Sequence, residues 1–498
     1  MSLFKPCKMV SVIMKTPKGD CLTRSSEMDI KTIFTYIFRY GSLALIGLAV
    51  IIPLFWGGYL FYRRVLHGSV KLTFRQAAAI ILLAGWLIVV IGLTALSRGA
   101  NFTGYINLSL FSGYVNAWNK WSYRELQLII FNMLMFAPLG FLLPLVSGKT
   151  QKMSVVFIIS LTLTVLIELV QLLSGKGIFE LDDIMHNTAG SLFGYFLIMA
   201  ILDIIERKRI RLMPLLKASA LPLLYVLLIS AAVLAYERQP YGNLPFLPAQ
   251  KQNMKRINVI KEAPLTDETF TVSVYRNLQA NDLSRIEELI QSVERLTGES
   301  FDRSFRVDNN VRMYAGISSG IQLTVFTESG EWTYTTWEQD RAILDDNEAE
   351  NRRQEMENWM GSFKSEPSGL IFSQQDGGTL RWDAPDHDRF RGRSDFVLGS
   401  VMAEYDASGT LAQLNWFLKY NSYCGEVETV SPLTAFRQIL QGNFYQYVPF
   451  EKNDRLVIED CVMDYEYDTK GFLRPVYRFS GYVNEPENIW QATVSAMK

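Results

Sequence analysis

Residues 167–195 read IELVQLLSGKGIFELDDIMHNTAGSLFGY and form two apolar segments separated by a short acidic turn. Each segment carries its polar residues at the end nearest the turn. Glu168 and Gln171 are spaced i, i+3 in the first segment. Asp183 and Asn187 are spaced i, i+4 in the second, so each pair shares one face of a helix. If the segments are membrane helices, both polar faces lie at the same membrane surface.

A carboxylate such as that of Glu168 is expensive inside a membrane helix. The cost is about 2.5–3.5 kcal/mol near the bilayer centre on insertion scales and smaller toward the interface. Two interpretations follow. Glu168 lies in the headgroup zone, where it is solvated or holds two helices together, or it lines a polar pocket that opens to one side of the membrane. We favour the pocket.

The length and composition of the chain indicate two different halves. A chain of 498 residues is too long for one hydrophobic core, so we expect at least two domains. Residues 1–236 contain long apolar runs, with 22 Lys and Arg against 10 Asp and Glu. Residues 237–498 read as soluble sequence, with 27 basic against 40 acidic residues. The overall charge of −1 therefore conceals a basic membrane half and an acidic soluble half.

The four cysteines and three histidines do not have the spacing of a metal site. We therefore expect neither a metal nor another cofactor. Cys424 and Cys461 lie in the same soluble half and could form a disulfide if that half is outside the cell. Sequence alone does not show whether the two residues are close enough to be bridged.

Six segments are long enough to cross a membrane, which takes about 20 apolar residues. Gly190 and Gly194 form a Gly-xxx-Gly face, which permits close packing of helices in lipid. We expect a structural role for these glycines and for Pro138, which lies within a span. The predicted spans are 33–62, 77–97, 127–147, 153–174, 184–205 and 213–236.

Basic residues indicate the orientation of these spans. They are concentrated in the loops at 63–75, 148–152 and 206–211, which should be cytoplasmic under the positive-inside rule. The soluble half would then lie outside the cell. Residues 1–31 are also basic and disagree with this orientation, so we expect them to be a disordered tail or a misassigned start.

This orientation brings polar residues from several spans to the outer leaflet, where random placement would scatter them between both sides. Asp182 stands at the start of the fifth span, where a carboxylate caps free amides and complements the helix dipole. We therefore give Asp182 a structural role. The remaining residues define the predicted binding pocket: Arg98, Asn132, Glu168, Gln171, Asp183 and Asn187.

Residues 77–205 resemble the VanZ-like membrane family, named for a protein associated with resistance to the glycopeptide teicoplanin. The sequence departs from the family pattern at Leu110, where a proline is usual, and at Glu180, where Asp is common. The loop turn at Asn107 is expected to be structural. The resemblance rests on five motifs in order: Leu96-Ser97-Arg98, Asn107-Leu108, Phe131-Asn132-Met-Leu-Met-Phe136-Ala-Pro138-Leu-Gly140-Phe, Ile167-Glu168-Leu-Val-Gln171 and Asp182-Asp183-Ile-Met-His-Asn187-Thr-Ala-Gly190.

The soluble half contains signals for helices and for pairs of strands. Ser284 and Glu287 form a capping-box pattern before a helix that ends at Gly298. Ser431-Pro432 opens a second helix that runs to Leu440. Three strand pairs are predicted at 321–327 and 331–337, at 396–405 and 411–420, and at 456–467 and 472–479.

We therefore predict an all-α polytopic membrane bundle of about six transmembrane helices, followed by an α+β extracellular domain with antiparallel sheets. The end of the chain, with Val476–Phe479 and Trp490, resembles extracellular regulatory domains of the PepSY-related kind. Asp383, Asp386, His387 and Asp388 are interpreted as a surface loop. The predicted parts are a leader (1–31), an additional transmembrane helix and basic cytoplasmic loop (32–76), the VanZ-like domain (77–205), a sixth transmembrane helix (206–236) and the ectodomain (237–498).

Two classes of function stay open. The resemblance implies a multi-pass protein of the bacterial cell membrane that is linked to the cell envelope and to antibiotic response, and it does not supply a mechanism. Our leading hypothesis is that the outer-leaflet pocket binds or senses a lipid-linked envelope component or a lipophilic, teicoplanin-type antibiotic. Its partners would be membrane lipids or a lipid-linked envelope precursor and, for the ectodomain, an extracellular or membrane protein, but no nucleic acid. The alternative is a membrane enzyme acting on a lipid-linked envelope precursor, with Glu168 or Asp183 as acid/base or metal ligand. A transporter is disfavoured, because the predicted polar residues lie at one leaflet and not at the midplane.

Overall fold

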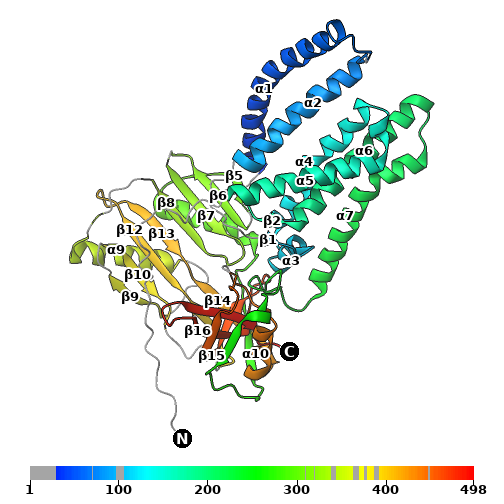
Figure 1. Cartoon of the computed structure of the whole chain (residues 1–498). Helices are drawn as coiled ribbons and strands as arrows, with labels where there is room; N and C mark the ends of the chain where they lie inside the picture. Colours follow the sequence, from blue (N-terminus) through cyan, green and yellow to red (C-terminus); the bar gives the residue numbers. More distant parts are fainter. Residues whose placement is uncertain are drawn as a thin grey trace.

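A helical bundle forms the first half of the chain, and two sheets with their helices form the second half (Figure 1). This arrangement confirms the predicted fold class of apolar helices followed by antiparallel sheets. The computed structural model describes residues 30–69, 71–96, 106–308, 310–318, 320–337, 342, 344–362, 369–374, 378–385, 392–446 and 449–498.

Within these residues, six helices are long and apolar enough to cross a membrane. Their ends follow from local sequence. The side chain of Thr73 accepts a hydrogen bond from the N–H of Gln76 at the start of α2, and Gly175 adopts a left-handed conformation that ends α5. The six are α1 (Ile30–Arg64), α2 (Phe74–Ile91), α4 (Tyr123–Val146), α5 (Met153–Ser174), α6 (Leu181–Arg207) and α7 (Leu212–Arg238).

Glycines allow α6 to lie directly against α4. A Cβ atom added to Gly190 would lie 1.9 Å from the carbonyl oxygen of Met133, and one added to Gly194 would lie 1.9 Å from that of Ala137. A Cβ atom on Gly140 of α4 would in turn lie 1.7 Å from a carbonyl oxygen of α6. Since backbone atoms cannot rotate away, any larger residue at these positions has to push the helices apart.

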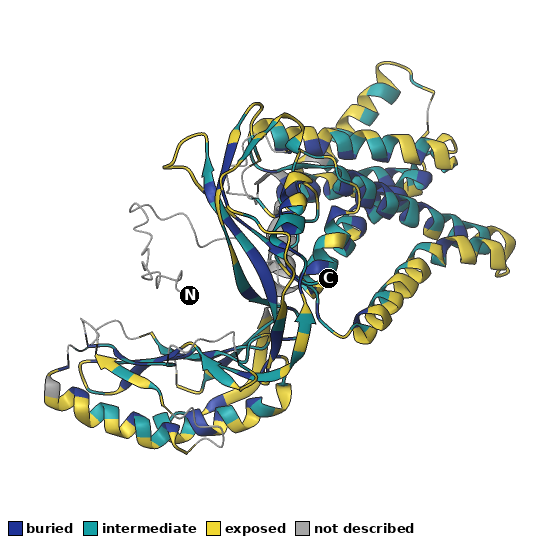
Figure 2. Ribbon diagram, turned by 90° about the horizontal axis from the view of Figure 1, so that it is seen from below, coloured by how far each residue is buried: buried dark blue, intermediate teal, exposed yellow. Residues whose placement is uncertain are grey.

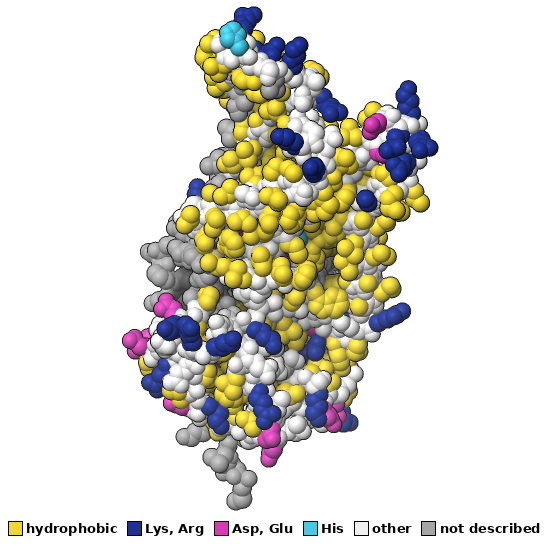
Figure 3. Space-filling model, turned by 45° about the vertical axis from the view of Figure 1, so that its right-hand side comes forward, with side chains coloured by type: hydrophobic (Ala, Val, Ile, Leu, Met, Phe, Trp, Pro, Cys, Tyr) yellow, Lys and Arg dark blue, Asp and Glu magenta, His cyan; other side chains and the backbone are white. Residues whose placement is uncertain are grey.

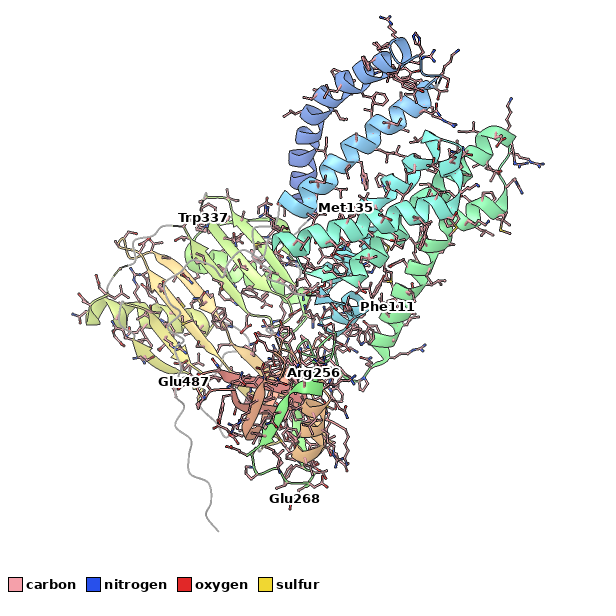
Figure 4. The ribbon with its side chains drawn as sticks, in the orientation of Figure 1. Phe111, Met135, Arg256, Glu268, Trp337 and Glu487 are labelled. Carbon is pink, nitrogen blue, oxygen red and sulfur yellow. The ribbon has the colours of Figure 1, made fainter. Side chains whose placement is uncertain are left out.

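Three short elements lie at the end of the bundle that faces the C-terminal domain (residues 237–498) (Figure 1). They are β1 (Ile106–Asn107), α3 (Ser112–Asn119) and β2 (Phe179–Glu180). β1 pairs with β2 in parallel, which places Asn107 opposite Glu180. The loop before α3 is therefore joined to the turn between α5 and α6. Phe111, just before α3, lies at this end of the bundle, whereas Met135 lies farther along α4 (Figure 4).

The first large sheet has eight strands and is covered on one face by α8 (Ile286–Thr297) and α9 (Asp346–Met360). Buried residues lie between the helices and the sheet, and exposed residues lie on the outer surface of α9 (Figure 2). In spatial order the strands are β5 (Phe301–Asp308), β6 (Val311–Gly316), β7 (Ile321–Phe326), β8 (Trp332–Thr336), β13 (Leu411–Trp416), β12 (Ser400–Tyr405), β10 (Leu380–Asp383) and β9 (Ile371–Gln374).

The second sheet has seven strands and packs against α10 (Pro432–Leu440). Its pairs are antiparallel except for β15 with β3, which are parallel. The spatial order is β11 (Phe396–Leu398), β14 (Lys419–Glu428), β4 (Thr271–Asn277), β16 (Phe472–Val483), β15 (Arg455–Tyr467) and β3 (Asn258–Lys261), with β17 (Ile489–Ser495) also paired to β16.

Two local predictions for this half need correction. The predicted hairpin 396–405 and 411–420 is not one pair of continuous strands, because both arms pass from one sheet to the other. The change occurs at Gly399, which has φ 101° and whose Cβ position would lie 1.8 Å from the carbonyl oxygen of Phe417. The capping box at Ser284 does not form either. Asp282 instead accepts the N–H of Ser284, at 3.0 Å, in a short 3₁₀ turn before α8.

The predicted disulfide is absent, since Cys424 and Cys461 are both free thiols. Cys424 lies on β14 and Cys461 on β15, and strands β4 and β16 lie between them. Three strand spacings amount to about 14 Å. A disulfide requires Cα atoms within about 7 Å. The sequence places both residues in one domain but does not reveal that two strands separate them.

The turn at residues 468–471, between β15 and β16, holds the end of α7. The Nζ atom of Lys470 donates to the carbonyl oxygens of Tyr236 and Gln239, each at 2.7 Å. The carbonyl of Tyr236 also accepts the N–H of Gln239 at 3.2 Å, and a cation at this position complements the helix dipole. The hydroxyl of Tyr236 donates to Thr469 Oγ1 at 2.8 Å. The last membrane helix is thus fixed to the second sheet.

The same junction reaches α3. Asn243 Nδ2 donates to the carbonyl oxygen of Trp118 at 2.6 Å, and Asn119 Nδ2 donates to that of Leu247 at 3.1 Å. The ring of Trp121 stacks on that of Tyr236, with centroids 3.6 Å apart. α3 is therefore a bridge between the bundle and the C-terminal domain.

Candidate functional site

Three helices supply the described residues of the predicted pocket. Asn132 lies on α4, Glu168 and Gln171 lie on α5, and Asp183 and Asn187 lie on α6. All five are near the ends of these helices that face α3 and the C-terminal domain (Figure 1). The sixth predicted residue, Arg98, lies outside the described residues.

The closest contact in this group joins α4 to α6. Asn132 Nδ2 donates to Asp183 Oδ1 at 2.6 Å. Both residues are only partly buried, unlike Glu168 and Gln171, which are 1% and 2% exposed. The accessible part of the cluster is therefore the edge formed by Asn132 and Asp183.

Glu168 is not solvated, so the solvated form of the first interpretation is wrong, whereas its contact fits the other form, in which Glu168 holds two helices together. Its Oε2 atom accepts the backbone N–H of Glu180 at 3.2 Å, which ties α5 to the turn before α6. Deeper in the bundle, Asn187 Nδ2 donates to Thr164 Oγ1 at 2.9 Å, a second link between α5 and α6. Hydrogen bonds of this kind reduce the cost of placing polar groups in lipid.

Asp182 has a structural role, but it does not cap its own helix as predicted. Its Oδ1 atom accepts the N–H of Phe111 at 2.6 Å, and its Oδ2 atom accepts the N–H of Gly113 at 2.8 Å and the hydroxyl of Ser112 at 3.1 Å. The carboxylate thus supplies the cap for α3, whose own N-cap residue, Phe111, makes no side-chain cap bond. Asp182 is 4% exposed.

Asn107 supports the same loop. Its Nδ2 atom donates to Ser112 Oγ at 2.9 Å and to Glu180 Oε1 at 3.3 Å, and its Oδ1 atom accepts the N–H of Ser109 at 3.0 Å. The turn forms although Leu110 replaces the usual proline. Pro138 lies inside α4, which continues through it without a break.

A second polar group was not predicted. His186 Nε2 lies 3.1 Å from the hydroxyl of Tyr114, which is also hydrogen-bonded to the hydroxyl of Tyr225. These residues come from α6, α3 and α7. His186 lies in the acidic motif and could have been proposed from it. The two tyrosines carry no sequence signal, because their approach depends on how α3 and α7 pack.

The acidic residues do not assemble into a metal centre within the part of the chain that the structure describes, where no group of three or more His, Cys, Asp or Glu could hold an ion. The three donors that Asp182 binds leave that carboxylate committed to α3. Asn132 and Asp183 are partly exposed, and their side chains carry oxygen atoms that accept hydrogen bonds. Such a site favours ligands that carry hydroxyl, amide or ammonium donors.

Basic side chains mark the opposite end of the bundle. Arg63 and Arg64 lie in the last turn of α1 and Arg207 lies in the last turn of α6, whereas Lys149 lies between α4 and α5. Figure 3 shows Lys and Arg at the end of the bundle away from the C-terminal domain. A largely hydrophobic surface lies between this basic end and the C-terminal domain. The cluster of polar site residues and the basic loops thus lie at opposite ends of the membrane helices.

Comparison with known proteins supports the resemblance seen in the motifs. Residues 78–203 match the VanZ/LLP1 family model, and the match begins within α2 and ends within α6. No curated protein matches the chain. A solved structure of an uncharacterized protein from Eubacterium rectale ATCC 33656 is 8% identical with a TM-score of 0.21, over 48% of this chain and 87% of that one. This TM-score is too low to indicate a shared fold, and the PepSY-like resemblance stays a prediction.

Proposed function

Because the membrane bundle is VanZ-like, we propose that this protein binds or senses a lipid-linked component of the bacterial cell envelope or a lipophilic glycopeptide of the teicoplanin type. The binding edge would be Asn132 and Asp183, with Glu168, Gln171 and Asn187 behind it and Arg98 as a further candidate. The observation that carries the proposal is the 2.6 Å contact between Asn132 and the half-buried carboxylate of Asp183, near the end of the bundle that faces the C-terminal domain.

Two physical arguments support a binding role. Polar side chains within membrane segments are costly and commonly mark functional sites. The helices that carry the polar residues also present apolar side chains on their outer surfaces, since Leu134 on α4 is 51% exposed and Leu173 on α5 is 84% exposed. A ligand with an acyl or prenyl chain and a donor-rich headgroup would place each part against matching chemistry.

The proposed location follows from the basic loops. If these loops are cytoplasmic, the site and the C-terminal domain are on the outer side of the cell membrane. The contacts of α3 with Asn243 and Leu247 would then connect the site to the extracellular domain. This connection supports sensing, because a ligand that moves α3 would change the contacts between α3 and that domain.

The binding proposal predicts a loss of affinity in the Asp183→Asn variant. The change replaces a charged acceptor by an amide and should weaken the binding of teicoplanin, or of a lipid-linked disaccharide-peptide, by about tenfold, or roughly 1.4 kcal/mol. Thermophoresis on full-length protein in lipid nanodiscs measures this directly. The Asp203→Asn variant, on the same helix at the basic end, should bind as the native protein does.

Equal affinity of the Asp183→Asn and native proteins would contradict the proposed binding edge.

The Glu168→Gln variant separates the enzyme alternative from the binding function. If native protein consumes the lipid-linked probe in a mass-spectrometric assay, and Glu168→Gln retains binding but abolishes consumption, the enzyme function replaces the binding function.

Orientation can be tested with the native thiols. In a variant in which Cys7 and Cys21 are replaced by serine, a membrane-impermeant maleimide applied to intact cells should label Cys424 without prior reduction. Cys461 should not react at neutral pH, because burial raises the pKa of its thiol to about 12 and leaves almost no thiolate. A thiol introduced by Lys149→Cys should react only after permeabilisation. The reverse pattern would place the C-terminal domain in the cytoplasm.

A further inference from the structure

The polar face of α5 continues from the proposed binding edge toward the basic end of the bundle. Ser160, Thr164 and Glu168 are spaced by four residues and therefore lie on one side of the helix. Ser160 and Thr164 are fully buried, and Glu168 is 1% exposed. On α6, Asn187 and Ser191 are also four residues apart, and both are buried. Of these residues, only Glu168 and Asn187 were predicted from the sequence.

The two polar faces meet. Asn187 Nδ2 donates to Thr164 Oγ1 at 2.9 Å, and this contact fixes the register of the antiparallel helices. One turn further from the binding edge, the same register places Ser160 opposite Ser191. We call the four residues Ser160, Thr164, Asn187 and Ser191 the polar seam.

The polar seam contains buried polar atoms that are not paired. Ser160 Oγ, Ser191 Oγ and Asn187 Oδ1 have no hydrogen-bond partner in the described part of the chain. A buried polar group without a partner costs about 1–3 kcal/mol. If these side chains only held the helices together, they would bond to one another or to backbone carbonyls. Buried oxygen atoms without a partner on two packed helices instead fit positions next to water molecules.

The polar seam passes the middle of the membrane. Ser160 lies about 21 Å along the axis from the end of α5 at Ser174, at 1.5 Å per residue. The hydrocarbon core of a bilayer is about 30 Å thick. At its inner end the seam stops at Val156, which is fully buried, and at the level of Tyr195, whose hydroxyl donates to the carbonyl oxygen of Gln151 at 2.9 Å.

We propose that the polar seam binds a row of water molecules through which hydrogen exchanges between the polar end of the bundle and the level of Ser160. Each water accepts one proton and donates another, so every O–H bond that breaks is replaced and no net charge is left at the closed end of the row. The row is closed at its inner end by Val156. This proposal does not depend on the identity of any ligand at Asn132 and Asp183. It also removes the argument against transport, because polar groups do reach the midplane.

Hydrogen–deuterium exchange of introduced thiols tests the proposal. Ser160→Cys places an S–H group in the polar seam, whereas Ile158→Cys places one at nearly the same depth on the lipid-facing side of α5, where Ile158 is 60% exposed. Both are made in the full-length chain with its four native cysteines replaced by serine and studied in nanodiscs. After transfer to heavy water, infrared spectroscopy should show the Ser160→Cys thiol exchanging on the order of ten times faster.

Closing the polar seam from its outer end should stop this exchange. Adding Asn187→Leu, which keeps the size of the side chain, should slow the Ser160→Cys thiol to the rate of the Ile158→Cys thiol. Thr164→Val is the substitute if thermal unfolding shows that Asn187→Leu does not fold. Exchange at Ser160→Cys no faster than at Ile158→Cys would overturn the water row. Fast exchange that the closing substitution does not slow would overturn the proton route from the polar end.

Discussion

A Gly190→Ala variant is expected to lose about 4 kcal/mol or more of folding free energy, a loss seen only for severe core substitutions. The added Cβ atom would lie 1.9 Å from the carbonyl oxygen of Met133 and 2.6 Å from its Cα atom. Both are backbone atoms of α4, so relief requires separating α4 from α6. Separation would break the 2.6 Å hydrogen bond between Asn132 and Asp183 as well. Thermal unfolding of the purified protein in nanodiscs measures the loss.

The matched control is Gly58→Ala in α1, where a Cβ atom would have no neighbour within 4 Å. Alanine is favoured over glycine within a helix by about 1 kcal/mol, so this variant should be as stable as the native protein or slightly more so. If Gly190→Ala unfolds at the same temperature as Gly58→Ala, the close contact of α4 and α6 is wrong. The combination of Gly190→Ala with Gly194→Ala should cost less than the sum of the two, because the first substitution already separates the helices.

The membrane helices could be predicted closely from sequence because each depends on a local property. A long apolar run requires a helix in lipid, where every backbone group must bond within its own segment. The predicted span 153–174 has the same limits as α5 (Met153–Ser174), and 213–236 differs from α7 (Leu212–Arg238) by one residue at the start and two at the end.

Contacts that depend on tertiary packing could not be predicted in the same way. Asp182 stands at the start of α6 and satisfies the local rule for a helix cap, but its carboxylate caps α3, about 70 residues earlier in the chain. The pairing of β1 with β2 produces this arrangement, and two-residue strands give no periodic signal. Tyr225 was missed for the same reason, since only the packing of α7 brings it to Tyr114.

The polar seam could not be predicted from the sequence for a different reason. Serine and threonine are common in membrane helices and usually bond to their own backbone, so their presence in a span is not a functional signal. Ser160 becomes informative only when its partner across the interface, Ser191, and the absence of a hydrogen bond among the described residues are known. Charged residues such as Glu168 can be recognised from sequence because their cost in lipid is high wherever they point.

The helix α3 joins the proposed binding edge to the C-terminal domain through the carboxylate of Asp182. Asp182→Ala would leave the N–H groups of Phe111 and Gly113 and the hydroxyl of Ser112 without their acceptor. Two stranded amides at about 1–3 kcal/mol each should destabilise the local structure by about 3 kcal/mol. The membrane helices should remain folded, because Asp182 makes none of the close contacts between α4 and α6.

Limited proteolysis should therefore reveal the Asp182→Ala variant before thermal unfolding does, with faster trypsin cleavage after Lys120, the residue that follows α3. Release of α3 would also remove the contacts of Trp118 and Asn119 with residues 243–247, so trypsin cleavage after Lys251, the first basic residue beyond that segment, should rise together with cleavage after Lys120. Asp182→Asn should fall between the native protein and Asp182→Ala, because one oxygen is kept while the amide NH₂ faces a donor. Asp203→Asn, at the other end of α6, should leave cleavage after Lys120 unchanged. If Asp182→Ala is cleaved no faster than Asp203→Asn, α3 is held by its contacts with the C-terminal domain alone, and the carboxylate does not connect the site to that domain.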